Sequence, residues 1–284
     1  MGVVSGIAGK ISKDTTIITH CRRWSISETD DLPGYVSSNS SGGMRRIAGA
    51  KDWAGQFEAI GYLPNIKPGD AFTFHGSIDG TDGLNALAMC EEIEVNINHE
   101  SGESIGYRAA ISGNGGVTYG AEDAEVDTAL TLGQSPLALP VKVTPGAGGG
   151  AGVEVTLADI RSARLLFKRS LQRYVSNSTS GAAKRTTGPF DCSLTLSQYV
   201  DDLAASGLPA INNSYQVKVY CTASLFWDIK FMRLRSIEPD CDIESGRPVA
   251  LNYNFDFTGA ATVSGTPTIG YVNTPESTPV AWWP

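Results

Sequence analysis

The side chains that most often perform chemistry in proteins are sparse in this chain and are not grouped. The three histidines (His20, His75 and His99) are not spaced as HxxxH or HExxH, the patterns that place two imidazoles on one metal ion. The segment 79–83, Asp-Gly-Thr-Asp-Gly, resembles part of a calcium loop but lacks the further ligands and the closing Glu. The sequence therefore predicts no metal site and no cofactor.

One nucleophile motif is present. Residues 102–106, Gly-Glu-Ser-Ile-Gly, spell the Gly-x-Ser-x-Gly turn that presents the reactive serine of an α/β-hydrolase. That turn has to connect a strand to a helix, whereas this segment is predicted to connect two strands. No grouping of nucleophile, base and oxyanion-stabilising residue is visible in the sequence. We therefore expect that the protein is not an enzyme.

Composition narrows the class of protein. The net charge of −8 over 284 residues argues against tight nucleic-acid binding, because phosphate contacts need clustered Lys and Arg. Five cysteines, an odd number without a CxxC pair, predict reduced and mostly buried thiols. The sequence shows no signal-peptide pattern at its start and no run of about 18 apolar residues. We expect a soluble protein that is made in a cytoplasm.

The chain repeats itself. The segment 35–42 returns at 174–181, and Arg46, Gly49 and Asp52 return 139 positions later (185 − 46 = 139) as Arg185, Gly188 and Asp191. Glu100 and the two residues after it return at Glu244 (244 − 100 = 144). A repeat of this extent predicts two domains of one kind. The predicted divisions are a first domain (1–113), a linker or arm (114–152), a second domain (153–259) and a C-terminal tail (260–284). The segment 114–152 is too apolar for a bare linker, so its apolar residues, including Leu139, Val141 and Val143, are predicted to form an extra strand or an arm that docks on a neighbour.

Within each domain the apolar residues alternate with polar ones. Ile93, Val95 and Ile97 alternate with Glu94, Asn96 and Asn98, and the segments 105–111 and 249–257 behave in the same way. Strands are also predicted at 72–74 and 217–219. We expect a mainly β fold of two tandem antiparallel sandwich or barrel domains. Each has at most one short helix, after about Gln198 in the second domain and near 82–89 in the first.

A series of small motifs carries a resemblance to a known family. They are Trp24-Ser25-Ile26, the polar loop 35–43, the basic segment 45–49, Asp52-Trp53-Ala54-Gly55, the Pro-Gly-aromatic strand 68–74 and the hairpin 93–113. In this order they resemble the tail tube (major tail) proteins of long-tailed bacteriophages, some of which contain fused tandem tube domains. The second domain departs from the pattern where Ala163 replaces Trp24 and Cys192 replaces Trp53.

The resemblance implies a β-sandwich core and a long hairpin that joins neighbours into a continuous barrel. Single-domain members form six-fold rings around a DNA channel, so three two-domain chains would form a pseudo-hexameric ring. It implies a virion tail protein that assembles in the host bacterial cytoplasm. Its partners would be its own copies, other tail proteins and the genome DNA, which passes through without specific binding; no membrane is implied.

Two groups of residues are candidates for function. Polar loop and basic residues are predicted to contact the next ring or a neighbouring subunit: Tyr35, Ser37, Asn39, Arg45, Arg46, Tyr174, Ser176, Asn177, Lys184 and Arg185. A mobile surface loop and a DNA-gripping role for the basic pairs are the alternatives. Acidic residues are predicted to face the channel, or to form an ordinary solvated sheet face: Glu91, Glu92, Glu94, Asp240, Asp242 and Glu244.

Four other assignments use the same fold expectation. Within the virion, the chain could be a tail terminator, a distal tail protein or a capsid decoration protein. Outside it, a carbohydrate-binding β-sandwich module is the alternative of a different class. Assembly into long tubes discriminates the tube protein from all of these.

Overall fold

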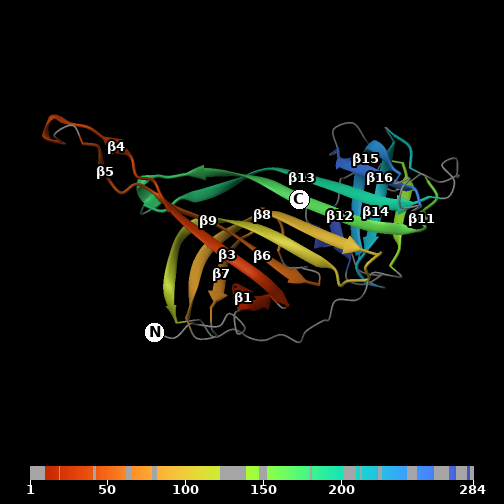
Figure 1. Ribbon diagram of the computed structural model, residues 1–284, viewed down its shortest axis with the longest axis horizontal. Helices are drawn as coiled ribbons and strands as arrows, with labels where there is room; N and C mark the ends of the chain where they lie inside the picture. Colours follow the sequence, from red (N-terminus) through yellow and green to blue (C-terminus); the bar gives the residue numbers. More distant parts are fainter. Residues whose placement is uncertain are drawn as a thin grey trace.

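The computed structural model describes residues 10–18, 20–40, 43–61, 66–78, 82–121, 139–146, 152–179, 181–200, 209–211, 213–222, 226–241, 248–258, 269–272 and 280–281. The fold is mainly β, as the alternating pattern predicted. Sixteen strands, all paired antiparallel, form one continuous sheet, and two short strands form a separate ribbon. Figure 1 shows the first half of the chain, in red to yellow, beside the second half, in green to blue.

Each half contributes seven strands to the main sheet. The first half forms β1 (Lys10–Lys13), β2 (Thr16–Ile18), β3 (Cys21–Asp30), β6 (Lys51–Ile60), β7 (Ala71–Ser77), β8 (Asp82–Asn98) and β9 (Gly106–Ala121). The second half forms β10 (Val141–Pro145), β11 (Val155–Leu157), β12 (Ile160–Tyr174), β13 (Lys184–Tyr199), β14 (Ser214–Tyr220), β15 (Phe226–Asp240) and β16 (Ala250–Phe257). Two short strands follow, β17 (Ile269–Val272) against β15 and β18 (Val280–Ala281) against β17.

The two halves have the same strand order. The first runs β2-β1-β7-β8-β9-β6-β3 and the second runs β11-β10-β14-β15-β16-β13-β12, so every strand has a counterpart with equivalent neighbours. The registers agree as well: Trp24 faces Phe57 in one half, and Ala163 faces Leu196 in the other. An irregularity between Cys90 and Glu92 returns between Leu234 and Ser236. A slip of one residue would turn each side chain to the other face, so this agreement is a strict match.

Each half-sheet folds over its own aromatic core. In the first half, Trp24 and Phe57 contact Phe74, with ring centroids 6.0 and 6.3 Å apart, although Phe74 lies on a distant strand of the sheet order. In the second half, Phe167 of β12 lies 4.8 Å from Trp227 of β15. These rings are among the largest contributors to burial, because aromatic side chains remove the most apolar area from water. The arrangement is consistent with a β-sandwich.

The predicted helix near 82–89 is wrong. This segment is the first part of β8 and pairs with β7 on one side and β9 on the other. Leu84, Ala86 and Ala88 are buried while Leu87 is exposed, which is the two-residue period of a strand. The helical propensity of Leu, Ala and Met gave the wrong expectation, since pairing on both sides outweighs local preference. The second helix was predicted after Gln198. Strand β13 ends at Tyr199, and 201–208 lie outside the described residues.

The predicted linker at 114–152 is wrong at both ends. Strand β9 continues past Gly113 to Ala121. Strand β10 is an inner member of the second half, where it pairs with both β14 and β11. The glycine-rich segment 145–152 therefore connects two strands of one hairpin rather than two domains. Val141 and Val143 are fully buried in that hairpin, which explains why the segment is too apolar for a linker.

A thin hairpin projects from the first half. It consists of β4 (Gly34–Tyr35), β5 (Arg45–Arg46) and the short 3-10 helix η2 (Ser38–Ser40) between them, and we call 34–46 the arm. Figure 1 shows the arm standing away from the rest of the chain. Within the described residues, no helix is long and apolar enough to cross a membrane.

Candidate functional site: the contact between the halves

The halves are joined by direct strand pairing, which we call the joint. The last part of β8 pairs antiparallel with β12, from Glu92 opposite Lys168 to Asn98 opposite Ser162. On its other edge, the same part of β8 pairs with β9. The joint therefore continues the hydrogen-bonded ladder of one half into the other.

The joint has a dry face and a charged face. On the dry face, the side chains that point into the core are at most 4% exposed: Ile93, Val95, Ile97, Ala163, Leu165 and Phe167. This alternation follows directly from the two-residue period of both strands. Burial of these six side chains supplies most of the stabilisation at the joint.

On the charged face, acids of the first half meet bases of the second half. Glu94 accepts a hydrogen bond from Arg164 at 2.8 Å, and Lys168 lies 3.9 Å from Glu92. Arg161 lies 2.8 Å from Glu100. Burial alone would raise the pKa of Glu94, but the hydrogen bonds from Arg164 and Asn96 outweigh it, and the pKa is lowered. These pairs add register specificity, since exposed ion pairs each contribute only about 0–1 kcal/mol.

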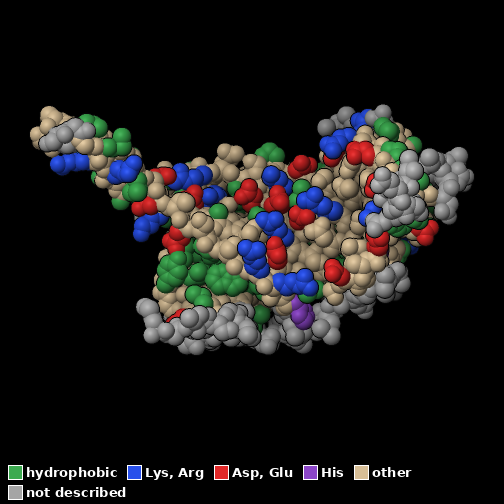
Figure 2. Space-filling model, in the orientation of Figure 1, with side chains coloured by type: hydrophobic (Ala, Val, Ile, Leu, Met, Phe, Trp, Pro, Cys, Tyr) green, Lys and Arg blue, Asp and Glu red, His purple; other side chains and the backbone are tan. Residues whose placement is uncertain are grey.

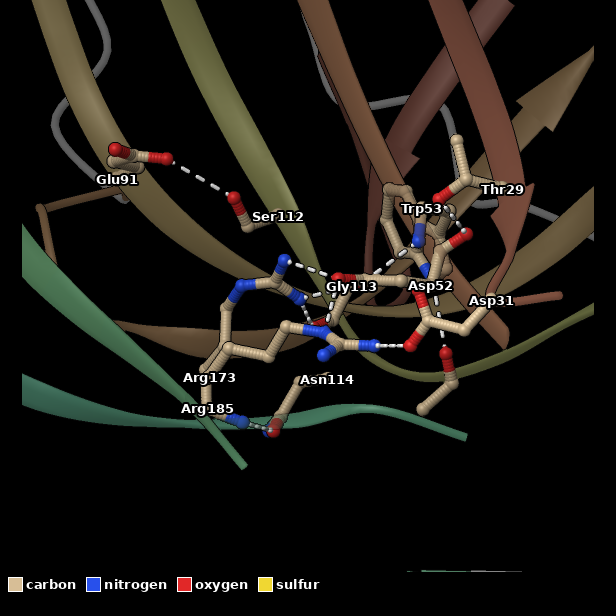
Figure 3. A network of polar contacts seen from close by, with 11 residues as sticks. Thr29, Asp31, Asp52, Trp53, Glu91, Ser112, Gly113, Asn114, Arg173 and Arg185 are labelled. Atoms are coloured by element: carbon tan, nitrogen blue, oxygen red, sulfur yellow. Dashed lines mark hydrogen bonds and ion pairs between the residues drawn. The ribbon is translucent and has the colours of Figure 1, made fainter. Parts of the chain in front are cut away.

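A second contact between the halves is centred on Asp52 of β6. Arg185 donates two hydrogen bonds of 2.9 Å to its two carboxylate oxygens, and Arg173 donates a third of 2.9 Å. Figure 3 shows both guanidinium groups directed at this carboxylate. Arg173 also donates to Asp31, at 2.7 Å. Paired donors from one guanidinium to one carboxylate are the strongest and most directional of such contacts.

The backbone fixes the Asp52 carboxylate from its own side. The amide of Trp53 donates to it at 2.8 Å, and Arg185 also donates to the carbonyl oxygen of Gly113. Asn114 accepts a hydrogen bond from the Arg185 amide at 3.0 Å. Burial works to raise the pKa of Asp52, but the hydrogen bond from Arg185 and the one from the Trp53 amide outweigh it and lower the pKa.

The loop that carries Arg185 is itself docked on the first half. This docked loop, residues 174–184, contains the 3-10 helix η5 (Asn177–Thr179) and runs beside the start of β6. The amide of Lys51 donates to the carbonyl of Gly181, and the amide of Ala183 donates to the carbonyl of Lys51, both at 2.8 Å. Ala183 is fully buried. The docked loop is the counterpart of the arm, so equivalent segments are packed in one half and projecting in the other.

Among the sheet edges with no strand beside them in the part of the chain that the structure describes, two are the counterparts of the edges paired at the joint. Strand β3, the counterpart of β12, pairs only with β6. The end of β15 from Ser236 to Asp240, the counterpart of the β8 segment at the joint, pairs only with β16. These edges differ in charge. Arg22 and Arg23 are exposed near the start of β3, and Glu238 and Asp240 are exposed at the end of β15.

The predicted contact residues divide between the arm and the docked loop. Tyr35 is 45% exposed in the arm, and Arg45 donates to the backbone carbonyl of Asn39 in the same arm. Tyr174, Ser176 and Asn177 lie in the docked loop or at the end of β12. Of the predicted basic residues, Arg185 forms its ion pair between the two halves of one chain, a contact that the sequence did not reveal.

The predicted acidic residues lie mainly at the joint. Glu92 and Glu94 face basic residues there, Glu91 accepts a hydrogen bond from Ser112 at 3.0 Å, and Asp240 lies 3.8 Å from Arg161. Asp242 and Glu244 lie outside the described residues. Figure 2 shows acidic and basic side chains interspersed over this face rather than gathered by sign.

The residues that could perform chemistry remain scattered. In the described ranges, no three His, Cys, Asp or Glu side chains come together in a way that could hold a metal ion. The Gly-x-Ser-x-Gly segment connects β8 to β9, so the prediction that it lies between two strands is confirmed. Cys90, Cys192 and Cys221 are buried, as expected for structural thiols. No protein-family model and no curated protein matches the chain.

Proposed function

We propose that this protein is a virion structural protein, a tail tube subunit that assembles through its sheet edges into stacked rings around a channel for genome DNA. One observation carries the proposal. The chain joins its halves by pairing β8 with β12, and no described strand pairs with the counterparts of these two edges, in β15 and β3. The same pairing between chains would use both edges.

Strand edges of this kind need to be covered in an assembled protein. An exposed strand edge presents unpaired amide and carbonyl groups that can pair with any other chain. Head-to-tail pairing of identical subunits forms a ring when the rotation between neighbours closes. If each chain supplies two equivalent units, three chains supply the six units of the ring that the resemblance implies.

The net charge of the chain is better suited to a channel wall that DNA passes than to a surface that binds DNA. With a net charge of −8, long-range attraction to DNA is weak and repulsion keeps the polyanion from sticking to the wall. The basic residues of the contact between the halves are neutralised by acids of the same chain. The function would then depend on geometry and on assembly, and not on recognition of bases.

The proposal is tested by the mass of the purified full-length chain in solution together with negative-stain electron microscopy. We expect masses in multiples of three chains, rings with six-lobed outlines, and stacking of rings into tubes at higher concentration. Single rings that never stack would support a tail terminator instead. A monomer at all concentrations would contradict the proposed function.

A further inference from the structure

Two of the three residues of the sequence repeat, the aspartate and the glycine, have identifiable structural roles in both halves. Asp52 accepts a hydrogen bond from the amide of Trp53 at 2.8 Å, and Asp191 accepts one from the amide of Cys192 at 2.9 Å. At Gly49, an added Cβ would lie 2.2 Å from the Asp31 carbonyl oxygen. At its counterpart Gly188, an added Cβ would lie 3.1 Å from the carbonyl oxygen of Ser170.

The third repeated residue is the arginine, and here the halves differ. Arg185 pairs with Asp52 across the two halves. Its counterpart Arg46 and the counterpart of Asp52, Asp191, are both exposed, and neither forms an ion pair within the described part of the chain. The chain thus has both members of the pair in both halves, but completes only one of the two possible pairs.

We propose that the arm docks on the second half of a second copy of this chain, where Arg46 pairs with Asp191 of that copy. The inference rests on the proposed self-association and names its contact. The occupant is a second copy because, among the described residues, the docked loop shows that the first half receives such a segment, and the second half has the equivalent surface. The ion pair between the chains would repeat the contact of Arg185 with Asp52.

The apolar residues of the arm agree with this placement. Met44 is 65% exposed, whereas its counterpart Ala183 in the docked loop is fully buried. Val36 in the arm and Ile47 directly after it are also exposed, at 60% and 58%. A projecting hairpin with several solvent-exposed apolar side chains is typical of a segment that is covered in an assembly. By the same equivalence, the parallel bridge from Lys51 to Ala182 predicts a bridge from Phe190 to Gly43 of the neighbouring chain.

Charge reversal tests this contact. Arg46→Asp and Asp191→Arg, each made singly in the full chain, place like charges together and should raise the dissociation constant of self-association about tenfold or more. The double variant restores opposite charges within every interface and should recover most of the lost affinity. Asp191→Asn keeps the acceptor for the Cys192 amide and should weaken association less than the reversal does.

Arg45→Asp is the matched control, because it makes the same change of charge one residue away in the arm. We expect that the loss it causes is not reversed by Asp191→Arg. Circular dichroism melts would establish that each variant is folded. If wild type associates but Arg46→Asp does not weaken it, or the double variant is no better than the single ones, the contact is refuted and the tube assignment stands. A wild-type chain that never associates would refute both.

Discussion

At the scale of single residues, Asp52 is the centre of the second contact between the halves. Its carboxylate accepts hydrogen bonds from two arginines of the second half and from a backbone amide of its own strand. Its counterpart Asp191 has the equivalent amide contact but no arginine partner in the described residues. The two aspartates therefore allow the arginine contribution to be measured separately from the backbone contribution.

We expect Asp52→Asn to lower the free energy of unfolding by about 1–3 kcal/mol, because two guanidinium groups lose their anionic partner. Asp191→Asn is the control and should cost less, provided that both are measured on dissociated chains by urea denaturation. Equal losses would contradict the assigned role of Arg185 and Arg173.

The same pair of variants has a predictable dependence on pH. The pKa of Asp52 is lowered in the folded chain, so its stabilising contribution is present above the ordinary value of 3.8 and is lost as the pH falls through the lower folded value. The difference in stability between wild type and Asp52→Asn should therefore be constant near neutral pH and should shrink in acid. A difference that grows as the pH falls would be inconsistent with this assignment.

At the scale of elements, the arm and the docked loop are the informative pair. The docked loop forms backbone hydrogen bonds to Lys51 and buries Ala183, whereas the arm projects with exposed side chains. Shortening the docked loop by removing 174–182 should therefore lower the melting temperature of the chain. The matched deletion of 35–43 should leave the melting temperature nearly unchanged and should abolish ring formation and stacking. Tubes of normal length from that deletion would exclude a role for the arm.

The strands could be predicted where the alternation of apolar and polar residues is enough by itself to identify them. Ile93, Val95 and Ile97 are such a case, and β8 has the expected faces. The first part of β8 was missed because Leu84 to Met89 is rich in good helix formers, and only pairing with β7 and β9 makes it a strand. Strand β10 was predicted only as one of two alternatives, an extra strand or a docked arm, because the glycines beside it suggested a linker, although they connect it to β11.

The site was less predictable than the strands. The recurrence of Arg46 and Asp52 as Arg185 and Asp191 was visible in the sequence, but which arginine meets which aspartate depends on how the halves lie together. The sequence repeat did not indicate a role for Arg173, because its counterpart in the first half is Gly34. Local pattern identifies the elements, whereas contacts more than a hundred residues apart are set by the pairing of β8 with β12.

At the scale of the whole molecule, the equivalence of the halves predicts the register of contact between chains. If β3 pairs with the end of the neighbouring β15 as β12 pairs with β8, then Ser25 takes the place of Arg164, and Glu238 takes the place of Glu94. Arg164 donates to Glu94 across the joint at 2.8 Å, so the wild-type contact between chains would lack this ion pair.

Ser25→Arg should supply that ion pair and strengthen self-association, by up to about fivefold for each contact, because exposed pairs contribute about 0.2–1 kcal/mol. Ser25→Glu places a carboxylate beside Glu238 and should weaken association by a similar factor. Analytical ultracentrifugation at low and high salt would measure both, and the two variants should converge as salt screens the charges. No strand of the described residues lies beside the outer edge of β3 at Ser25, so neither variant should change the stability of the separate chain. Opposite effects of the two variants in low salt are expected if a carboxylate of another copy lies near residue 25, as Glu238 would in this register, whereas equal effects would place the edge of β3 away from β15 of its neighbour.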